Sequence, residues 1–232
     1  MFDVYKTKYK LIRIGAEHDG GYVVPELDGF DLYIGGGVGS DYTLEDDYDA
    51  IKHFNIKDYK VFDGTTQNIP CDADPNYIRK NIGIMNTDTL TNLRKEVENY
   101  SNVFLKMDIE NCEWDWINFM DYDTLNKFKM IVIELHFYMH GVDDVEMFEK
   151  LSALKKLQKT HRLVHVHGNN CSPCMLEFGP YKFASVSEFT FVRKEYASDE
   201  FSTTKLPIDG LDFKNEPTKD DIPFINIHSS TV

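Results

Sequence analysis

Seven apolar runs, separated by amphipathic or turn-rich stretches, organise the chain up to residue 193. Each run is short and continuous, as expected for strands that are buried on both faces of a parallel sheet. The runs lie at residues 32–40, 60–65, 81–85, 102–110, 130–137, 162–170 and 188–193. Between them, the pattern predicts helices at 42–54, 76–80, 90–100 and 142–158, with an amphipathic stretch at 111–119. Strands that alternate with helices predict an α/β fold, with a Rossmann-like, doubly wound sheet of about seven mostly parallel strands.

The first 30 residues have a different pattern. Two short apolar runs, at 11–15 and 22–25, flank a Gly-Gly turn. This arrangement predicts a hairpin that covers one end of the sheet. Arg13, His18 and Asp19 lie in or beside its connecting loop, where they either reach a ligand or stay in solvent.

The first apolar run of the core ends in glycines. Gly35, Gly37 and Gly39 alternate with other residues at the point where a buried strand must turn, and a helix with Glu45 in its first turn follows. In such a strand, loop and helix, the backbone can approach a ligand closely because no Cβ stands in the way. The motif allows a dinucleotide, a nucleotide or S-adenosylmethionine. The three glycines and Glu45 are therefore candidate cofactor-binding residues.

Two acidic residues extend this candidate site. Asp63 ends the next strand, 24 residues beyond Gly39. Nucleotide-binding α/β folds place a carboxylate near that spacing, where it accepts hydrogen bonds from the ribose hydroxyls. Asp63 also precedes a glycine, which is common in turns. Asp88 either caps the helix expected after it or reads the adenine amine of the ligand.

Polar residues also end the later strands of the predicted sheet. Asp108 ends one strand, Glu134 and His136 end the next, and His167 and Asn169 end the one after that. Side chains two residues apart on a strand point to the same side, so Glu134 and His136 face together. A buried carboxylate needs a partner. Because ligands bind beyond the carboxyl ends of parallel strands, we expect these residues to line one rim with the glycines.

Length and charge limit the class of protein. With 232 residues, the chain is read as one domain, divided into an N-terminal cover (1–30), a core (31–193) and a C-terminal tail (194–232) that is ordered in patches. The formal net charge of −14 repels phosphate backbones and anionic membranes, which excludes nucleic acid as a partner. No run approaches the roughly 20 apolar residues of a membrane span, and the N-terminus lacks the apolar stretch of a signal peptide. A cytoplasmic protein is therefore expected.

The four cysteines fit reduced thiols in that compartment. Cys171 and Cys174 have the two-residue spacing of a zinc knuckle, but Cys71 and Cys112 supply no second pair of that spacing. A structural zinc site is therefore not expected.

The motifs together resemble a known family. They are Gly35-x-Gly37-x-Gly39, Asp63, Lys106-Met107-Asp108-Ile109-Glu110-Asn111-Cys112-Glu113 and Ile133-Glu134-Leu135-His136. The chain resembles the FkbM-like S-adenosylmethionine-dependent methyltransferases from about Arg13 to Arg193. It departs from the family pattern at Tyr33, where an Asp is frequent, and at Asn111, where Gly is usual.

The resemblance implies a class I methyltransferase fold and an O-methyltransferase that uses S-adenosylmethionine. The implied acceptor is a sugar hydroxyl, in a nucleotide-linked sugar or in a surface glycan such as a capsular polysaccharide. A homodimer is left open. The rival functions are a methyltransferase with a non-sugar acceptor, an NAD(P)-dependent oxidoreductase and a non-catalytic binding module. The oxidoreductase lacks support because the chain shows no evident Tyr-x-x-x-Lys pair for hydride transfer.

Methyl transfer to a hydroxyl requires that its proton be removed or its pKa be lowered. Asp108, Glu134 and His136 could hold a divalent metal of Mg or Mn type. Alternatively, His136 or His167 acts as general base, held by Asp108 or Glu134. In a third, structural alternative, Glu134 pairs with Lys106 or Arg13 inside the rim of the sheet.

Overall fold

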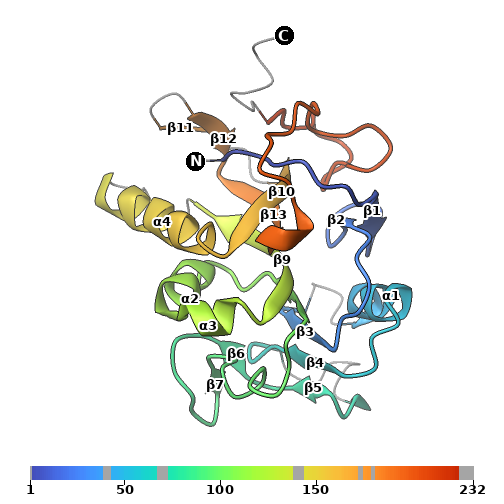
Figure 1. The fold of residues 1–232 in the computed structure, drawn as a ribbon, viewed down its shortest axis with the longest axis vertical. Coiled ribbons are helices and arrows are strands. Elements are labelled where there is room, and N and C mark those ends of the chain that lie inside the picture. The colour runs from blue at the N-terminus through green and yellow to red at the C-terminus, as the bar shows by residue number, and fades with distance from the viewer. Residues whose placement is uncertain are drawn as a thin grey trace.

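A seven-stranded, mostly parallel sheet forms the centre of the protein. The computed structural model describes residues 2–38, 43–66, 73–137, 144–171, 175–178 and 181–224. The strand order of the sheet is β10-β13-β9-β8-β3-β4-β5 (Figure 1). Its strands are β3 (Leu32–Gly36), β4 (Tyr59–Phe62), β5 (Tyr77–Ile78), β8 (Val103–Met107), β9 (Phe128–His136), β10 (His161–Gly168) and β13 (Val186–Arg193). Only β13 runs against its two neighbours.

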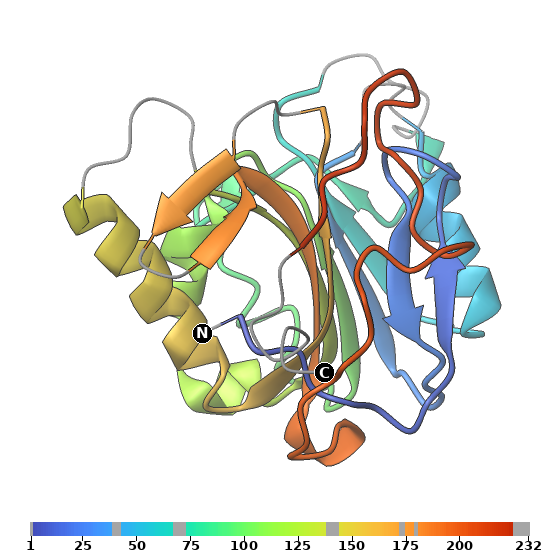
Figure 2. The same cartoon turned by 90° about the horizontal axis from the view of Figure 1, so that it is seen from above.

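Both faces of the sheet are covered (Figure 2). On one side lie helix α1 (Glu45–His53) and a hairpin made of β1 (Leu11–Ile14) and β2 (Tyr22–Pro25). On the other side lie α2 (Glu113–Phe119), α3 (Tyr122–Leu125) and α4 (Asp144–Leu157). The expected N-terminal cover is thus confirmed as an antiparallel hairpin.

The buried strands explain how the two faces are held. Every residue of β9 is buried, and its side chains alternate between the two faces with the strand period of two. Met130 and Val132 pack into the core under the hairpin and α1. Ile131 and Ile133 pack into the core under α2 and α4. By this alternation, Glu134 and His136 belong to the hairpin side of the sheet.

The chain order around β3 creates a switch point in the sheet. From β3 the chain builds outward through β4 and β5, and it then returns to the other edge of β3 with β8 and β9. The loops after β3 and β8 therefore leave the sheet in different directions. In open α/β sheets such a point forms the crevice in which ligands bind, beyond the carboxyl ends of the strands.

The structure corrects the interpretation of residues 76–85. The expected short helix at 76–80 is wrong, because Tyr77 and Ile78 form the edge strand β5 of the central sheet. Asn81–Ile82 is a strand, β6, but it pairs with β7 (Leu90–Thr91) in a separate two-stranded parallel sheet. The third strand of the central sheet, expected at 81–85, is thus the two-residue strand β5, which lies earlier in the sequence.

The helix expected at 90–100 is also wrong. After β7, the backbone N–H of Leu93 donates to the Thr91 hydroxyl at 3.2 Å, and that of Arg94 donates to Asn92 Oδ1 at 3.2 Å. Leu93 itself has a φ of 66°. Side chains that satisfy the backbone locally compete with a helix, and the chain forms turns here instead.

Two further segments were not expected. Strands β11 (Met175–Phe178) and β12 (Tyr181–Ala184) form a separate hairpin between β10 and β13. After a short 3-10 turn at Lys194–Tyr196, the chain returns along the β1–β2 side, drawn in red in Figure 2. We call its residues 206–222 the C-terminal strap. The strap reaches the end of β10, where Ile222 forms an antiparallel bridge with Gly168.

None of the helices in the described ranges combines the length and apolar character needed to cross a membrane. Cys112 and Cys171 are free and exposed, whereas Cys71 and Cys174 lie outside the described residues.

Candidate active site

The glycine turn after β3 is fixed by close contacts within the protein. Gly37 has a φ of 83°, and a Cβ there would lie 1.8 Å from the carbonyl oxygen of Asp108. A Cβ on Gly35 would lie 2.3 Å from Asp47 Oδ1 on α1. Lys106 Nζ donates to the Gly37 carbonyl at 2.9 Å, which joins the turn to β8. The glycines therefore let β3 pass close to α1 and to the loop after β8, while Gly39 lies outside the described residues.

Asp63 ties the loops after β3 and β4 together. Its buried carboxylate accepts the backbone N–H of Val38 at 3.0 Å through Oδ2. Oδ1 accepts both the backbone N–H of Thr65 at 2.8 Å and its hydroxyl at 2.7 Å. A carboxylate oxygen accepts two hydrogen bonds, so Oδ2 keeps capacity for one more donor. Asp63 is thus both a turn residue and a carboxylate able to meet a ligand hydroxyl.

The other two predicted cofactor residues lie farther out. Glu45 is exposed at the start of α1 and lines an open cleft of about 510 Å³ together with Tyr48 and Asp74. Asp88 is exposed in the turn between β6 and β7, outside the central sheet. Asp88 caps no helix, because none follows it.

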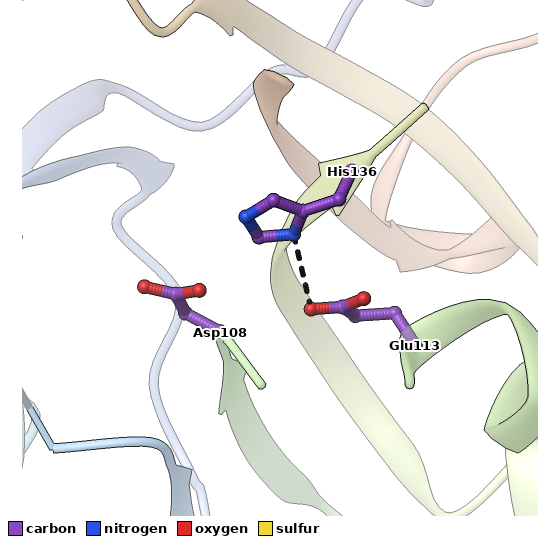
Figure 3. Close-up of side chains that lie close together, drawn as sticks. All are labelled: Asp108, Glu113 and His136. Atoms are coloured by element: carbon purple, nitrogen blue, oxygen red, sulfur yellow. Dashed lines mark ion pairs between the residues drawn. The ribbon is translucent and has the colours of Figure 1, made fainter. Parts of the chain in front are cut away.

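Three side chains face one another at the rim (Figure 3): Asp108 directly after β8, Glu113 at the start of α2 and His136 at the end of β9. Glu113 has no exposed surface, and its Oε1 lies 3.3 Å from His136 Nδ1 and accepts the backbone N–H of Ile109 at 3.0 Å. His136 Nε2 lies 3.5 Å from Glu110 Oε2 and 3.6 Å from Glu134 Oε1. The ring of His136 therefore faces carboxylates through both nitrogens.

A tight turn brings Glu113 back to the rim. Glu110 and Asn111 both have positive φ values, 56° and 85°. Asparagine tolerates this left-handed conformation better than most residues, and glycine tolerates it best. Asn111, which stands where the FkbM-like methyltransferases usually have Gly, is therefore compatible with the turn that the structure has.

Burial and mutual repulsion perturb the carboxylates at this rim. Burial raises the pKa of Asp108 to about 6, although the charges of Lys106 and His136 act to lower it. Burial, together with the charges of Asp108 and Glu188, raises the pKa of Glu134 well above its usual value. Burial acts to lower the pKa of His136, but the facing Glu113 outweighs it and the pKa is raised. Ionised carboxylates are therefore under electrostatic strain here.

A second row of polar side chains crosses three neighbouring strands. Glu134 on β9 is paired directly with Glu188 on β13, which is paired with His167 on β10. Antiparallel partners point to the same face, so the row lies on the hairpin side. Asn169 Nδ2 donates to both oxygens of Glu134, at 3.3 and 3.4 Å. The carboxylates of Glu134 and Glu188 approach that of Asp19, from the hairpin loop.

His167 is held as a cation in this row. Its Nδ1 lies 3.1 Å from Glu188 Oε2 and its Nε2 lies 3.1 Å from Asp221 Oδ1 on the C-terminal strap. Burial acts to lower the pKa of His167, but the hydrogen bonds to Asp221 and Glu188 prevail and raise it to about 10. An imidazole that keeps its proton at neutral pH, with both nitrogens engaged, is poorly suited to act as a general base.

The C-terminal strap is held by the polar end of β10. His165 Nε2 lies 3.1 Å from Asp212 Oδ2. Asn170 Nδ2 donates to the Glu216 carbonyl at 3.0 Å, and Asn170 Oδ1 accepts the Glu216 N–H at 2.7 Å. Asn215 Nδ2 donates to Glu188 at 2.6 Å and to Asp19 at 3.1 Å. The strap therefore closes one side of the rim.

The structure brings together most of the residues that the sequence singled out. Asp108, Glu134 and His136 lie at one rim, with His167 beside them, and Gly37 contacts Asp108 across the switch point. Sequence reasoning did not assign Glu113, although it lies in the family-like motif. It also missed Glu188 and the strap residues, which follow no periodic pattern. In the described part of the chain, neither Lys106 nor Arg13 forms an ion pair with Glu134, so the structural alternative gains no support.

A scan of the chain against protein-family models found no match, and a search of the curated proteins found no matching relative. The function therefore has to be argued from the site itself.

Proposed function

We propose that this chain is an S-adenosylmethionine-dependent O-methyltransferase with a Rossmann-like, class I methyltransferase fold, whose acceptor is a sugar hydroxyl. One observation carries the proposal. At the switch point between β3 and β8, the glycine turn closed by Asp63 stands directly beside a rim of carboxylates and imidazoles that includes Asp108, Glu134 and His136. The candidate cofactor site and the candidate acid-base site thus adjoin beyond the carboxyl ends of the strands.

The residues fit this cofactor in charge and in hydrogen bonding. S-adenosylmethionine carries a positive sulfonium and an ammonium group, and the rim offers buried carboxylates that lack enough cationic partners. The free acceptor capacity of Asp63 Oδ2 suits a ribose hydroxyl. The cleft beside α1, with Glu45 and Tyr48, is open enough for an adenine ring. Gly35 and Gly37 hold the adjoining turn in place.

When bound, the cofactor supplies an electrophilic methyl group. The protein must orient the acceptor hydroxyl and receive its proton. Asp108, with a pKa of about 6, is ionised near neutral pH and close to the ideal strength for a base. In one alternative, His136 is the general base. In the other, which the sequence motifs predict, Asp108, Glu134 and His136 hold a Mg or Mn ion that would lower the pKa of the hydroxyl. His167 positions Glu188 in this proposal.

The proposal is tested with methyl-labelled S-adenosylmethionine and a panel of nucleotide sugars and oligosaccharides. We expect transfer to at least one sugar and a loss of at least about a hundredfold in rate for Asp108→Asn, with cofactor affinity retained. Transfer only to phenols or proteins would overturn the sugar acceptor. A rise in melting temperature with NAD(P) but not with S-adenosylmethionine would overturn the reaction class.

A further inference from the structure

We infer that Asp108, Glu113 and His136 form a binding site for one divalent cation, and that Glu113 is its buried anchor. The sequence pattern suggested Glu134 as the third ligand and assigned no role to Glu113. The inference does not depend on methyl transfer, because it concerns cation binding by the chain alone.

The distances suit one ion. One ligand atom from each of the three residues lies within 4.8 Å of the other two. Around an octahedral ion with bonds of about 2.1 Å, ligand atoms lie roughly 3.0 to 4.2 Å apart. Small rotations of side chains would bring the three atoms into that range. Glu134 belongs to a second group, with Asp19 and Glu188. Its Oε1 also lies 3.6 Å from His136 Nε2, so Glu134 stands between the two groups.

Polar atoms without partners point to a missing ligand. Glu113 has no exposed surface, yet within the described residues its Oε2 has no hydrogen-bond partner, and neither has Asp108 Oδ1. His136 is 4 % exposed, and its Nδ1 has the ion pair with Glu113 Oε1 at 3.3 Å but no hydrogen bond of good geometry. Buried polar groups are normally satisfied, so each such atom needs an explanation. Figure 3 shows the three side chains converging from three different elements. A cation among them would engage these atoms together.

A simple ion pair explains less. Glu113 uses Oε1 to accept the Ile109 N–H, in the loop between β8 and α2, and to face His136 Nδ1. If it only bound this loop and faced the imidazole, Oε2 would remain buried without a partner in the described part of the chain. Lys106 Nζ donates to the Gly37 carbonyl and Arg13 donates to three backbone carbonyls, so neither forms an ion pair with Glu113 in the described part of the chain. A bound ion would place a positive charge in contact with that carboxylate.

The ligand chemistry indicates the type of ion. Two carboxylates and one imidazole form a mainly oxygen site, which suits Mn²⁺ and Mg²⁺. Three protein ligands leave positions open for water or for an acceptor oxygen. On the proposed function, the acceptor hydroxyl would occupy such a position.

The test is a titration of the full chain with Mn²⁺, without cofactor or acceptor. The electron paramagnetic resonance signal of the free ion measures how much Mn²⁺ is bound at each step. We expect one saturable site per chain, displaced by Mg²⁺. Glu113→Gln keeps the shape of the side chain and is expected to weaken Mn²⁺ binding at least about tenfold. Glu110→Gln is the matched control: this glutamate also approaches His136, at 3.5 Å, but it is 74 % exposed and lies outside the group. Its Mn²⁺ affinity should stay within about twofold of wild type.

Absence of saturable Mn²⁺ binding, or equal losses in the two variants, would overturn the inference, because equal losses mean diffuse attraction to an acidic surface. If Glu113→Gln does not fold, as judged by circular dichroism, His136→Gln is tested in its place and should show the same loss. Cation binding without any methyl transfer would leave the site standing and refute only the proposed function. Methyl transfer without cation binding would refute the cation site and leave the proposed function standing.

Discussion

Gly37 shows how one residue connects the loops that follow β3 and β8. It combines a left-handed φ of 83° with a backbone contact that leaves no space for a Cβ. Gly210 has a similar φ, 79°, but a Cβ there would meet nothing within 4 Å. The two glycines therefore separate the effect of conformation from that of crowding.

We expect Gly37→Ala to lower the free energy of unfolding by about 3 kcal/mol or more, since strain and a backbone clash add. Gly210→Ala should lower it by only about 1 kcal/mol, the cost of the left-handed conformation. Urea unfolding of both variants measures the difference. Similar losses would mean that the loop after β8 moves away freely, and that the contact with Asp108 is not a constraint.

Tyr33 stands where the FkbM-like methyltransferases frequently have an Asp, and in this chain it has a structural role. Its buried hydroxyl donates to Asp47 Oδ1 at 2.7 Å, on α1. Tyr33→Phe should lower the free energy of unfolding by about 1–3 kcal/mol, because Asp47 then loses a buried partner. Tyr48→Phe removes the hydrogen bond that the exposed Tyr48 donates to Asp74, which also accepts from Tyr59, and should change the free energy of unfolding by less than about 1 kcal/mol. Thermal and urea unfolding check both values, and equal effects would contradict the role given to Tyr33.

At the residue scale, the sequence predicted which strand-end side chains meet better than it predicted the other side chains that contact them. Asp108, Glu134 and His136 could be expected at one rim because polar residues at the ends of parallel strands must meet there. Glu113 could not, because its place depends on the left-handed turn at Glu110 and Asn111, which has no periodic signal. Asp221 comes from a segment without any regular structure.

At the scale of elements, the stability of the C-terminal strap depends on the protonation states of His167, Asp212 and Asp221. The folded pKa of His167, about 10, lies above the value near 6.5 of an unfolded chain. Its stabilising effect is therefore complete below about pH 6.5 and is lost as the pH rises toward 10. Burial acts to raise the pKa values of Asp212 and Asp221, but their hydrogen bonds to His165 and His167 lower them. The stability from these two carboxylates is present above the unfolded pKa near 3.8 and is lost as the pH falls through the lowered values.

We expect the strap to be most protected between about pH 4 and pH 6.5, and its protection to fall by up to about tenfold per pH unit from there toward pH 10. Hydrogen exchange of peptides from 206–222, corrected for intrinsic rates, measures this. In His167→Gln the dependence between pH 6.5 and pH 9.5 should disappear. The same pH slope in the variant would show that another group controls the strap.

The pattern of apolar residues located strands more reliably than helices. Continuous apolar runs identified β3, β4, β8, β9, β10 and β13, since only a buried strand accommodates such runs at that length. The helix expected at 76–80 is wrong because Tyr77 and Ile78 pair with β4. The helix expected at 90–100 is wrong because the side chains of Thr91 and Asn92 bind the local backbone. That competition depends on geometry that a spacing rule does not contain.

For the whole molecule, the charge of −14 opposes compact folding through self-repulsion. Raising NaCl from about 10 to about 200 mM at pH 7.5 should stabilise the protein by ~1 kcal/mol, or about 2–4 °C in melting temperature, because the Debye length falls to within the molecular dimensions. Near pH 5, close to the sequence pI of about 4.9, the same change in salt should have little effect. An equal rise at both pH values would contradict this origin.

The position of β13 has a consequence for synthesis on the ribosome. This strand is the last of the sheet in chain order, yet it fills the space between β9 and β10. Until residues 186–193 have emerged, the nascent chain holds β9, with Ile131 and Ile133, beside an unpaired edge, and β10 has no place in the sheet. The two parts of the sheet can therefore join only after residue 193 has emerged. A chain arrested earlier would present a long apolar edge, which is the kind of surface that chaperones protect from aggregation.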